Sequence, residues 1–367
     1  MQLSSEFREN FEERILQCSQ CGFCRAVCPL FAVSLRPAFN ARGKMMVLKD
    51  ALRGKLDLDE QVLDSIFQCT ACANCSHHCP SGVDVPGIVK AARREMSQAG
   101  SCHPAFTGLA QVLAQHGNIY AEEDPPEFQR PLNQPAEYVY FAGCVGNYRE
   151  EEASETVLDL LERLELNYTL IEEACCGGVL GDLGLEPVAA LAQANLERIL
   201  ATGARTVITG CPYCARTFLE RPEYQPLRDQ GIQVLVLSQL LAQLELPVTT
   251  DQRVTYHDPC DLGRHCGIYE EPRQVIAKIA PDFVELAHNR DQALCCGAGG
   301  GMRGAYPKNS LAMARRRLEE VEQAGAEVLL TDCNSCVHNL RNAKLRKQKI
   351  EIYTLAEYIG LLLDEAS

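Results

Sequence analysis

The sequence lacks any long apolar run and any recognisable leader. Its longest apolar stretches, such as residues 234–237 and 359–363, fall far short of the roughly 18 residues that a membrane-crossing helix needs. The first residues lead directly into charged side chains, without the basic and apolar regions of a signal peptide. We therefore expect a cytoplasmic protein, and any peripheral attachment to the inner face of the membrane should depend on partners.

The sequence also lacks the signs of nucleic-acid binding and of an organic cofactor. The formal net charge is −14, and the basic triplet Arg315-Arg316-Arg317 is too short to indicate a nucleic-acid surface. The glycine-rich segment 297–301 is a weak dinucleotide candidate, because no strand leads straight into it. A flavin or nicotinamide, where the function needs one, should therefore belong to a partner.

What the sequence does contain is cysteine: twenty residues, eighteen of them in four clusters. At 367 residues the chain is long enough for two or three domains with cores of their own, so small size does not explain the cysteines. Because we do not expect export, we do not expect stable disulfides either. We interpret the four clusters as metal ligands and the remaining Cys102 and Cys266 as partly buried free thiols.

Two of the clusters have the spacing C-x2-C-x2-C-x3-C-P of bacterial ferredoxins. In two-cluster ferredoxins, the fourth cysteine of each run binds the other cluster. We therefore expect two cubane [4Fe–4S] clusters with crossed ligands. The first would be held by Cys18, Cys21, Cys24 and Cys79, and the second by Cys69, Cys72, Cys75 and Cys28.

A zinc knuckle and a disulfide framework are the alternatives for these two runs. Zinc sites usually pair two C-x2–4-C units rather than four cysteines in series, which disfavours zinc. His77 and His78 lie inside the second run. We interpret them as spacers at the cluster surface, because four thiolates already satisfy the site.

The other two clusters share a rarer pattern, in which a single cysteine precedes Cys-Cys-Gly and then C-x2-C. The first set is Cys144, Cys175, Cys176, Cys211 and Cys214, and the second is Cys260, Cys295, Cys296, Cys333 and Cys336. Neighbouring Cα atoms lie about 3.8 Å apart, which makes a poor disulfide, so adjacent cysteines suit a metal assembly that accepts two thiolates. The glycines that follow would let backbone amides approach and donate hydrogen bonds to the sulfurs.

The N-terminal third should be a helical domain. Apolar residues recur at helical spacing in segments 5–15, 43–52 and 58–67, which predicts a mostly helical ferredoxin-type domain over residues 1–120 with two [4Fe–4S] clusters. Residues 121–136 are rich in acids and prolines, so we interpret them as a linker or a surface-draped crossing.

After the linker, β-rich runs alternate with long helical segments, as in a parallel α/β sheet. The alternation runs over residues 137–249 and recurs over 250–367, and an internal duplication is the simplest interpretation. The cysteine sets follow expected strands, such as 206–209 and 327–330, where open α/β sheets place their sites. The predicted fold class is therefore α plus α/β, a helical two-cluster domain followed by two duplicated α/β domains.

At these residues the chain resembles the cysteine-rich CCG family. The family includes the B and D polypeptides of heterodisulfide reductase and the iron–sulfur subunits of glycolate, lactate and anaerobic glycerol-3-phosphate dehydrogenases. A ferredoxin part followed by two CCG repeats is similar to the D polypeptide, in which the C and B polypeptides are fused. The resemblance implies a noncubane [4Fe–4S] cluster on each complete set of five cysteines. The final C-x2-C is whole in both sets, at 211–214 and 333–336, which favours the reductase-like branch.

Three hypotheses of function follow. In the first, the chain is an electron-transfer subunit that relays single electrons from a flavoprotein dehydrogenase to a quinone, a membrane subunit or another carrier. The alternative is catalytic: reduction of a disulfide at the two noncubane clusters, with the cubanes supplying electrons. A zinc-stabilised scaffold ranks far below both, because it leaves the spacing of eighteen cysteines without a purpose.

One further stretch, residues 257–269, also resembles the reductase-like branch. His257 or Asp258 could deliver protons to a thiolate product beside the second CCG set. A histidine at a strand end is more commonly structural.

Overall fold

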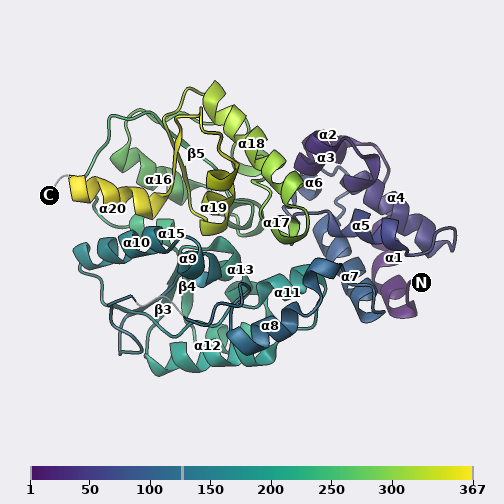
Figure 1. Ribbon diagram of the computed structural model, residues 1–367, viewed down its shortest axis with the longest axis horizontal. Helices are drawn as coiled ribbons and strands as arrows, with labels where there is room; N and C mark the ends of the chain where they lie inside the picture. Colours follow the sequence, from purple (N-terminus) through teal and green to yellow (C-terminus); the bar gives the residue numbers. More distant parts are fainter. Residues whose placement is uncertain (1, 125–127, 366–367) are drawn as a thin grey trace.

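The computed structural model describes residues 2–124 and 128–365. Figure 1 shows a helical N-terminal part on one side and two sheet-containing parts stacked on the other. Part of the predicted linker, residues 125–127, lies outside the described residues. Within the described ranges, no helix combines the length and the apolar composition needed to cross a membrane.

Helices make up the N-terminal part, as the apolar spacing predicts. Their bounds are α1 Ser5–Leu16, α2 Phe23–Val27, α3 Pro29–Ser34, α4 Ala41–Leu52, α5 Glu60–Phe67, α6 Asn74–His77, α7 Val85–Gln98 and α8 Leu109–His116. Side chains of Ser4 and Asp59 cap α1 and α5 by accepting hydrogen bonds from first-turn amides. Leu48, Ile66 and Val89 are fully buried between these helices and belong to one apolar cluster.

The two ferredoxin-type runs fold alike around the short helices α2 and α6. In both runs the residue two places after the first cysteine has a positive φ, 58° at Gln20 and 53° at Ala71. The residue after the second cysteine does too, 92° at Gly22 and 61° at Ala73. The left-handed turns bend each run back on itself, so that cysteines close in sequence can face a common point.

A four-stranded parallel sheet organises the middle of the chain. Its strands are β1 Tyr138–Phe141, β2 Tyr168–Thr169, β3 Thr206–Thr209 and β4 Gln233–Val236, in the order β2-β1-β3-β4. The accompanying helices are α9 Gly143–Tyr148, α10 Glu151–Arg163, α11 Gly178–Leu183, α12 Ala189–Ala201, α13 Pro212–Glu220, α14 Gln225–Asp229 and α15 Leu237–Leu241. Alternation of strands and helices with parallel pairing agrees with the sequence prediction of an α/β sheet.

A three-stranded parallel sheet organises the last third. Its strands are β5 Val254–Tyr256, β6 Val328–Thr331 and β7 Glu351–Thr354, in the order β5-β6-β7. The helices are α16 Glu270–Ile279, α17 Met302–Ala305, α18 Pro307–Gln323, α19 Asn334–Ala343 and α20 Leu355–Glu365. The two sheets are unequal at one edge. In the first sheet, β2 pairs with β1 on the side away from β3. On the side of β5 away from β6, the described residues show only an isolated bridge between Val254 and Phe283.

The cysteine-bearing loops lie at the carboxyl ends of strands. Cys144 and Cys211 follow β1 and β3, and Cys260 and Cys333 follow β5 and β6. Because these pairs of strands are adjacent and parallel, the loops of each pair emerge at one edge of the sheet.

The two sheet-containing parts share one apolar core. Leu158 and Leu161 from α10 belong to the same buried cluster as Leu355 and Ile359 from α20. Helix α20 approaches α10 closely at Gly360, where an added Cβ would lie 2.6 Å from the Thr156 side chain. These two parts are therefore packed against each other by hydrophobic burial rather than joined by a loose tether.

Arg93 joins the helical part to both sheets. Its side chain in α7 is fully buried and donates hydrogen bonds to five backbone carbonyls. Three belong to the helical part, those of Ile66, Phe67 and Cys69 at 3.3, 2.8 and 2.7 Å, and the others are those of Asp182 at 2.8 Å and Gly300 at 3.1 Å. One guanidinium therefore satisfies carbonyls from all three parts of the chain.

Replacing Arg93 by methionine should destabilise the protein by about 3–5 kcal/mol, because five buried carbonyls lose their donor. Anaerobic urea unfolding of the holoprotein measures the change. The matched control is Arg94→Met, since the neighbouring Arg94 side chain is 62% exposed and should change stability by no more than about 0.5 kcal/mol. Equal effects of the two substitutions would refute the role of Arg93.

Candidate metal centres

The structure brings the eight ferredoxin-type cysteines together as two groups. The first group surrounds Cys24. Burial raises the pKa of Cys24, and electrostatic repulsion from the nearby thiolates of Cys18, Cys21 and Cys79 raises it further. The second group lines a small cavity and consists of Cys28, Cys69, Cys72 and Cys75. Each group contains three cysteines of one run and the fourth cysteine of the other; that each group binds a cluster through these crossed ligands stays a prediction.

The first group lies at the surface and the second is buried. Cys21 is exposed, whereas Cys72 and Lys44 are buried. Burial raises the pKa of Cys28 to about 12, and the nearby Lys44 ammonium opposes this rise. Lys44 donates a hydrogen bond to the Phe39 carbonyl at 2.5 Å, which holds its positive charge beside the thiols.

The first CCG set converges in the interior. Hydrogen bonds with Cys144 and Cys176 raise the pKa of Cys175, and burial adds to the effect. Cys214 in turn hydrogen-bonds with Cys176 and Cys211, which raises its pKa in the same way. All five cysteines of the set therefore form one connected group of thiols.

The second CCG set converges in the same manner. Cys295 hydrogen-bonds with Cys260, and the Sγ atoms of Cys296 and Cys336 lie 3.2 Å apart. Hydrogen bonds from Cys295 and Cys336 lower the pKa of Cys296 to about 5. Cys336 also contacts Cys333, which connects all five members.

Glycines bring backbone amides to both sets, as their position after Cys-Cys suggests. The Gly177 amide lies 3.4 Å from the Sγ atom of Cys175, and the Gly297 amide lies 3.4 Å from that of Cys295. Gly177 and Gly297 have φ angles of 79° and 89°, a conformation that a residue with a side chain rarely adopts.

The composition of each CCG set fits an iron–sulfur cluster better than a zinc ion. A structural zinc site is four-coordinate, whereas five thiols converge here. Soft thiolates are the ligands that iron–sulfur clusters select. Packing so many thiols together raises the pKa values of several of them, and a bound metal assembly would remove the cost of their deprotonation.

A cavity of about 410 Å³ separates the two CCG sets. Cysteines of both sets line it, and the remaining wall includes Phe106, Tyr120, Tyr213 and Arg303. The two sets therefore face a common space.

Contacts between groups arrange all four in sequence. Cys75 is within electrostatic reach of Cys24, which links the two ferredoxin-type groups. Cys72 hydrogen-bonds with Cys295 and interacts with Cys260, which links the buried ferredoxin-type group to the second CCG set. The shared cavity then links the second CCG set to the first.

The glycine-rich loop after Cys296 lets the second CCG set approach the buried ferredoxin-type group closely. An added Cβ at Gly300 would lie 2.3 Å from the Cys69 carbonyl oxygen, so only glycine fits without a shift of the backbone. The glycine-rich segment, which we expected to approach the cluster sulfurs, thus also packs closely against the ferredoxin-type run.

Arg264 and Glu173 are two buried polar residues of these sites that the sequence analysis did not single out. Arg264 donates to the Cys72 carbonyl at 2.6 Å and lies near Cys260 and Cys295. Glu173 accepts hydrogen bonds from the Ala142 and Gly143 amides at 2.6 and 2.7 Å, which fixes the loop before Cys144. Burial raises the pKa of Glu173 to about 8. Charged residues that flank cysteine motifs are the sequence signal that could have identified both.

The remaining residues considered from the sequence have other surroundings. Cys266 lines a separate cavity beside α13 and β4, and burial raises its pKa to about 12. Cys102 packs in a small apolar cluster with Phe67 and Phe106. Nε2 of His77 lies 3.1 Å from the Arg264 carbonyl, and Nδ1 of His78 lies 2.9 Å from that of Asn74.

Family comparisons cover all four groups. The family described as CCG, cysteine-rich domain, matches residues 138–218 and 254–341. The family described as 4Fe-4S dicluster domain matches residues 14–83. All eighteen clustered cysteines fall within these three matches.

Several iron–sulfur and oxidoreductase proteins are similar over most of this chain. The D polypeptide of dihydromethanophenazine:CoB–CoM heterodisulfide reductase from Methanosarcina barkeri is 28% identical, over 89% of this chain and 88% of its own. The B polypeptide of fumarate reductase (CoM/CoB) from Methanothermobacter marburgensis is 25% identical, over 90% of this chain and 68% of its own length. EtfAB:quinone oxidoreductase of Syntrophomonas wolfei is 26% identical, over 93% of this chain and 57% of its own length.

The fold also resembles a solved structure. A hypothetical protein from Helicobacter pylori superposes with a TM-score of 0.60 over 98% of this chain and 76% of its own, at 12% identity. That likeness concerns the fold alone. The chain therefore carries a 4Fe-4S dicluster domain followed by two CCG cysteine-rich domains.

Proposed function

We propose that this chain is the iron–sulfur electron-transfer subunit of a multi-subunit oxidoreductase. The observation that carries the proposal is the serial arrangement of four cysteine groups, from the exposed Cys21 through the Cys72–Cys295 contact to the cavity between the two CCG sets. Such a series suits a relay that divides a two-electron oxidation into single-electron steps.

The cofactors in this proposal are two cubane [4Fe–4S] clusters and two further [4Fe–4S] clusters of noncubane type in the CCG domains. Their ligands would be the eighteen cysteines in the groups described above. The proposed division of the chain is a ferredoxin-type domain over residues 1–120, a linker over 121–136, and CCG domains over 137–249 and 250–367 that arose by duplication. When bound, the clusters would supply one-electron redox chemistry, and the chain would hold them in order.

A flavoprotein dehydrogenase is the proposed electron donor, and a quinone, a membrane subunit or another carrier is the proposed acceptor. The surface around Cys21 suits such a partner. No acidic residue occurs between Cys18 and Lys49 in a chain of net charge −14, and Phe23 and Leu35 are 64% and 73% exposed. Exposed apolar side chains in a segment that has basic but no acidic residues favour a partner with an acidic docking face.

The catalytic alternative, reduction of a disulfide at the CCG clusters, has weaker support. A relative named as a quinone oxidoreductase matches 93% of this chain. The shared architecture therefore does not require disulfide chemistry, whereas electron transfer is common to all these activities.

The cluster assignment predicts about sixteen irons per chain in anaerobically purified protein. The double substitution Cys333→Ala/Cys336→Ala removes two thiols of one CCG set and should lower the iron content by about four. The matched control, Cys102→Ala/Cys266→Ala, removes two thiols outside the groups and should leave iron unchanged. Metal analysis with EPR measures both. Fewer than ten irons, together with zinc in a CCG site, would refute the cluster assignment.

The partner assignment predicts that the tagged chain co-purifies anaerobically with a flavoprotein dehydrogenase whose substrate reduces the clusters. Arg25→Glu/Arg36→Glu should weaken this association, because it reverses charge beside the exposed cluster. Arg205→Glu, an exposed substitution in a different part of the chain, is the control. Disulfide reductase activity of the chain alone with a reduced viologen would instead support the catalytic alternative.

A further inference from the structure

The two CCG sets differ in the residue that stands three places before their first cysteine. In the second set this residue is His257, and in the first it is Phe141. Both are buried at the end of the strand that precedes the set, with exposed fractions of 1% and 0%. One position thus offers a nitrogen donor or acceptor, and the other offers only hydrocarbon.

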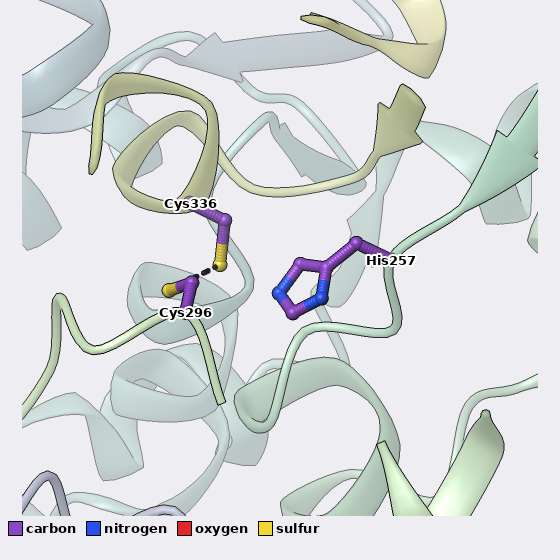
Figure 2. Close-up of side chains that lie close together, drawn as sticks. All are labelled: His257, Cys296 and Cys336. Carbon is purple, nitrogen blue, oxygen red and sulfur yellow. Dashed lines mark hydrogen bonds between the residues drawn. The ribbon is translucent and has the colours of Figure 1, made fainter. Parts of the chain in front are cut away.

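His257 points at the thiols of its set. One of its ring nitrogens and the Sγ atoms of Cys296 and Cys336 all lie within 4.8 Å of one another. Figure 2 shows a ring nitrogen turned toward the two thiols and the other turned away from them. Nε2 has no hydrogen-bond partner although it is buried, so an unpaired polar atom faces the sulfurs.

Arg317 settles which ring nitrogen carries the proton. Its fully buried guanidinium donates from Nε to Nδ1 of His257 at 3.1 Å. A guanidinium has no acceptor, so Nδ1 must contribute its lone pair and the proton of the neutral ring must reside on Nε2. Arg317 is itself held by the Glu320 carboxylate and by the His288 carbonyl at 2.8 Å.

The same contact argues against His257 as a metal ligand. Coordination through Nε2 would move the ring proton to Nδ1, where it would face the Arg317 N–H. Histidine ligands of metals normally donate their second N–H to a carboxylate, a carbonyl or water. The geometry therefore favours an N–H donor to sulfur over a His–Cys–Cys metal site.

We propose that His257 holds an N–H donor toward Cys296 and Cys336, where the sulfurs of a bound cluster would accept from it, and that it raises the reduction potential of the second CCG site above that of the first. The inference rests on the proposed iron–sulfur function of that site. An added electron increases the negative charge on the sulfurs, so a donor stabilises the reduced form more than the oxidised form.

The first set has no equivalent donor side chain at this position. Phe141 packs edge-on against Phe218, with ring centroids 4.9 Å apart. Thr217 Oγ1 lies 3.8 Å from the Cys176 Sγ atom, but its hydroxyl proton is donated to the Tyr213 carbonyl at 2.8 Å. The duplicated sites are therefore electrostatically unequal, with the more oxidising site next to the buried ferredoxin-type group.

Potentiometric EPR titration of the holoprotein tests the proposal. In His257→Asn the shorter amide can still accept from Arg317 but does not reach the sulfurs. At a fixed ambient potential, the ratio of the reduced to the oxidised form of the second site should be about tenfold lower in this variant than in the unsubstituted protein. His257→Gln extends its amide toward the sulfurs and should recover part of the loss. The control Phe141→Leu alters the matching position of the first set and should leave the second site unchanged.

The outcomes separate this inference from the function on which it rests. The EPR signal that disappears in Cys333→Ala/Cys336→Ala identifies the second site, and the absence of any such signal contradicts the proposed function itself. Full iron content with an unchanged potential in His257→Asn overturns the role of His257 alone. Loss of about four irons in His257→Asn also overturns it, because the residue would then be a ligand or a structural support.

Discussion

Five carbonyls from three parts of the chain converge on the guanidinium of Arg93, and this convergence connects the ferredoxin-type run to both sheet-containing parts. Arg93 donates to the carbonyls of both Cys69 and Gly300. The ferredoxin-type run therefore cannot move away from the glycine loop of the second CCG set without breaking one of these hydrogen bonds. A charged group is costly to bury, and here five carbonyl acceptors and the nearby Asp182 carboxylate offset that cost. The fold thus uses one cation to position groups more than 200 residues apart in the chain.

Buried cations lie beside two of the four thiol groups. Lys44 lies beside the buried ferredoxin-type group, Arg264 lies between that group and the second CCG set, and Arg317 supports the histidine of that set. Iron–sulfur clusters with thiolate ligands are anionic, and a low dielectric strengthens the attraction to a nearby fixed charge. The interior therefore combines soft ligands with positive charge, and folding and cluster binding should stabilise each other.

Local spacing predicted the groups themselves but not their order. Cysteines three residues apart, such as Cys69 and Cys72, are brought together by turns that the run itself encodes, and the strands before Cys144 and Cys260 follow from short β-rich runs. No spacing indicates that Cys72 meets Cys295 rather than a cysteine of the first set, because that contact depends on how whole domains pack. The missing counterpart of β2 in the second sheet was likewise invisible in a pattern that otherwise repeats.

Long-range cations were equally hidden from the sequence. Arg93 is followed by Arg94, and nothing local distinguishes the buried arginine from the exposed one. Lys44 lies in an amphipathic helix where a surface lysine would look the same. Their roles come from acceptors supplied by distant segments, which a single sequence does not reveal.

The exposure of Cys21 has a consequence for how the protein is damaged. Molecular oxygen and other oxidants attack accessible thiolates and clusters first, and this cysteine is the exposed one among the described thiols. Oxidative loss should therefore begin at the outermost group and disconnect the relay while the three interior groups are still intact. A protein docked over that surface would then act as a shield as well as a redox partner, and the free subunit would be the oxygen-sensitive form.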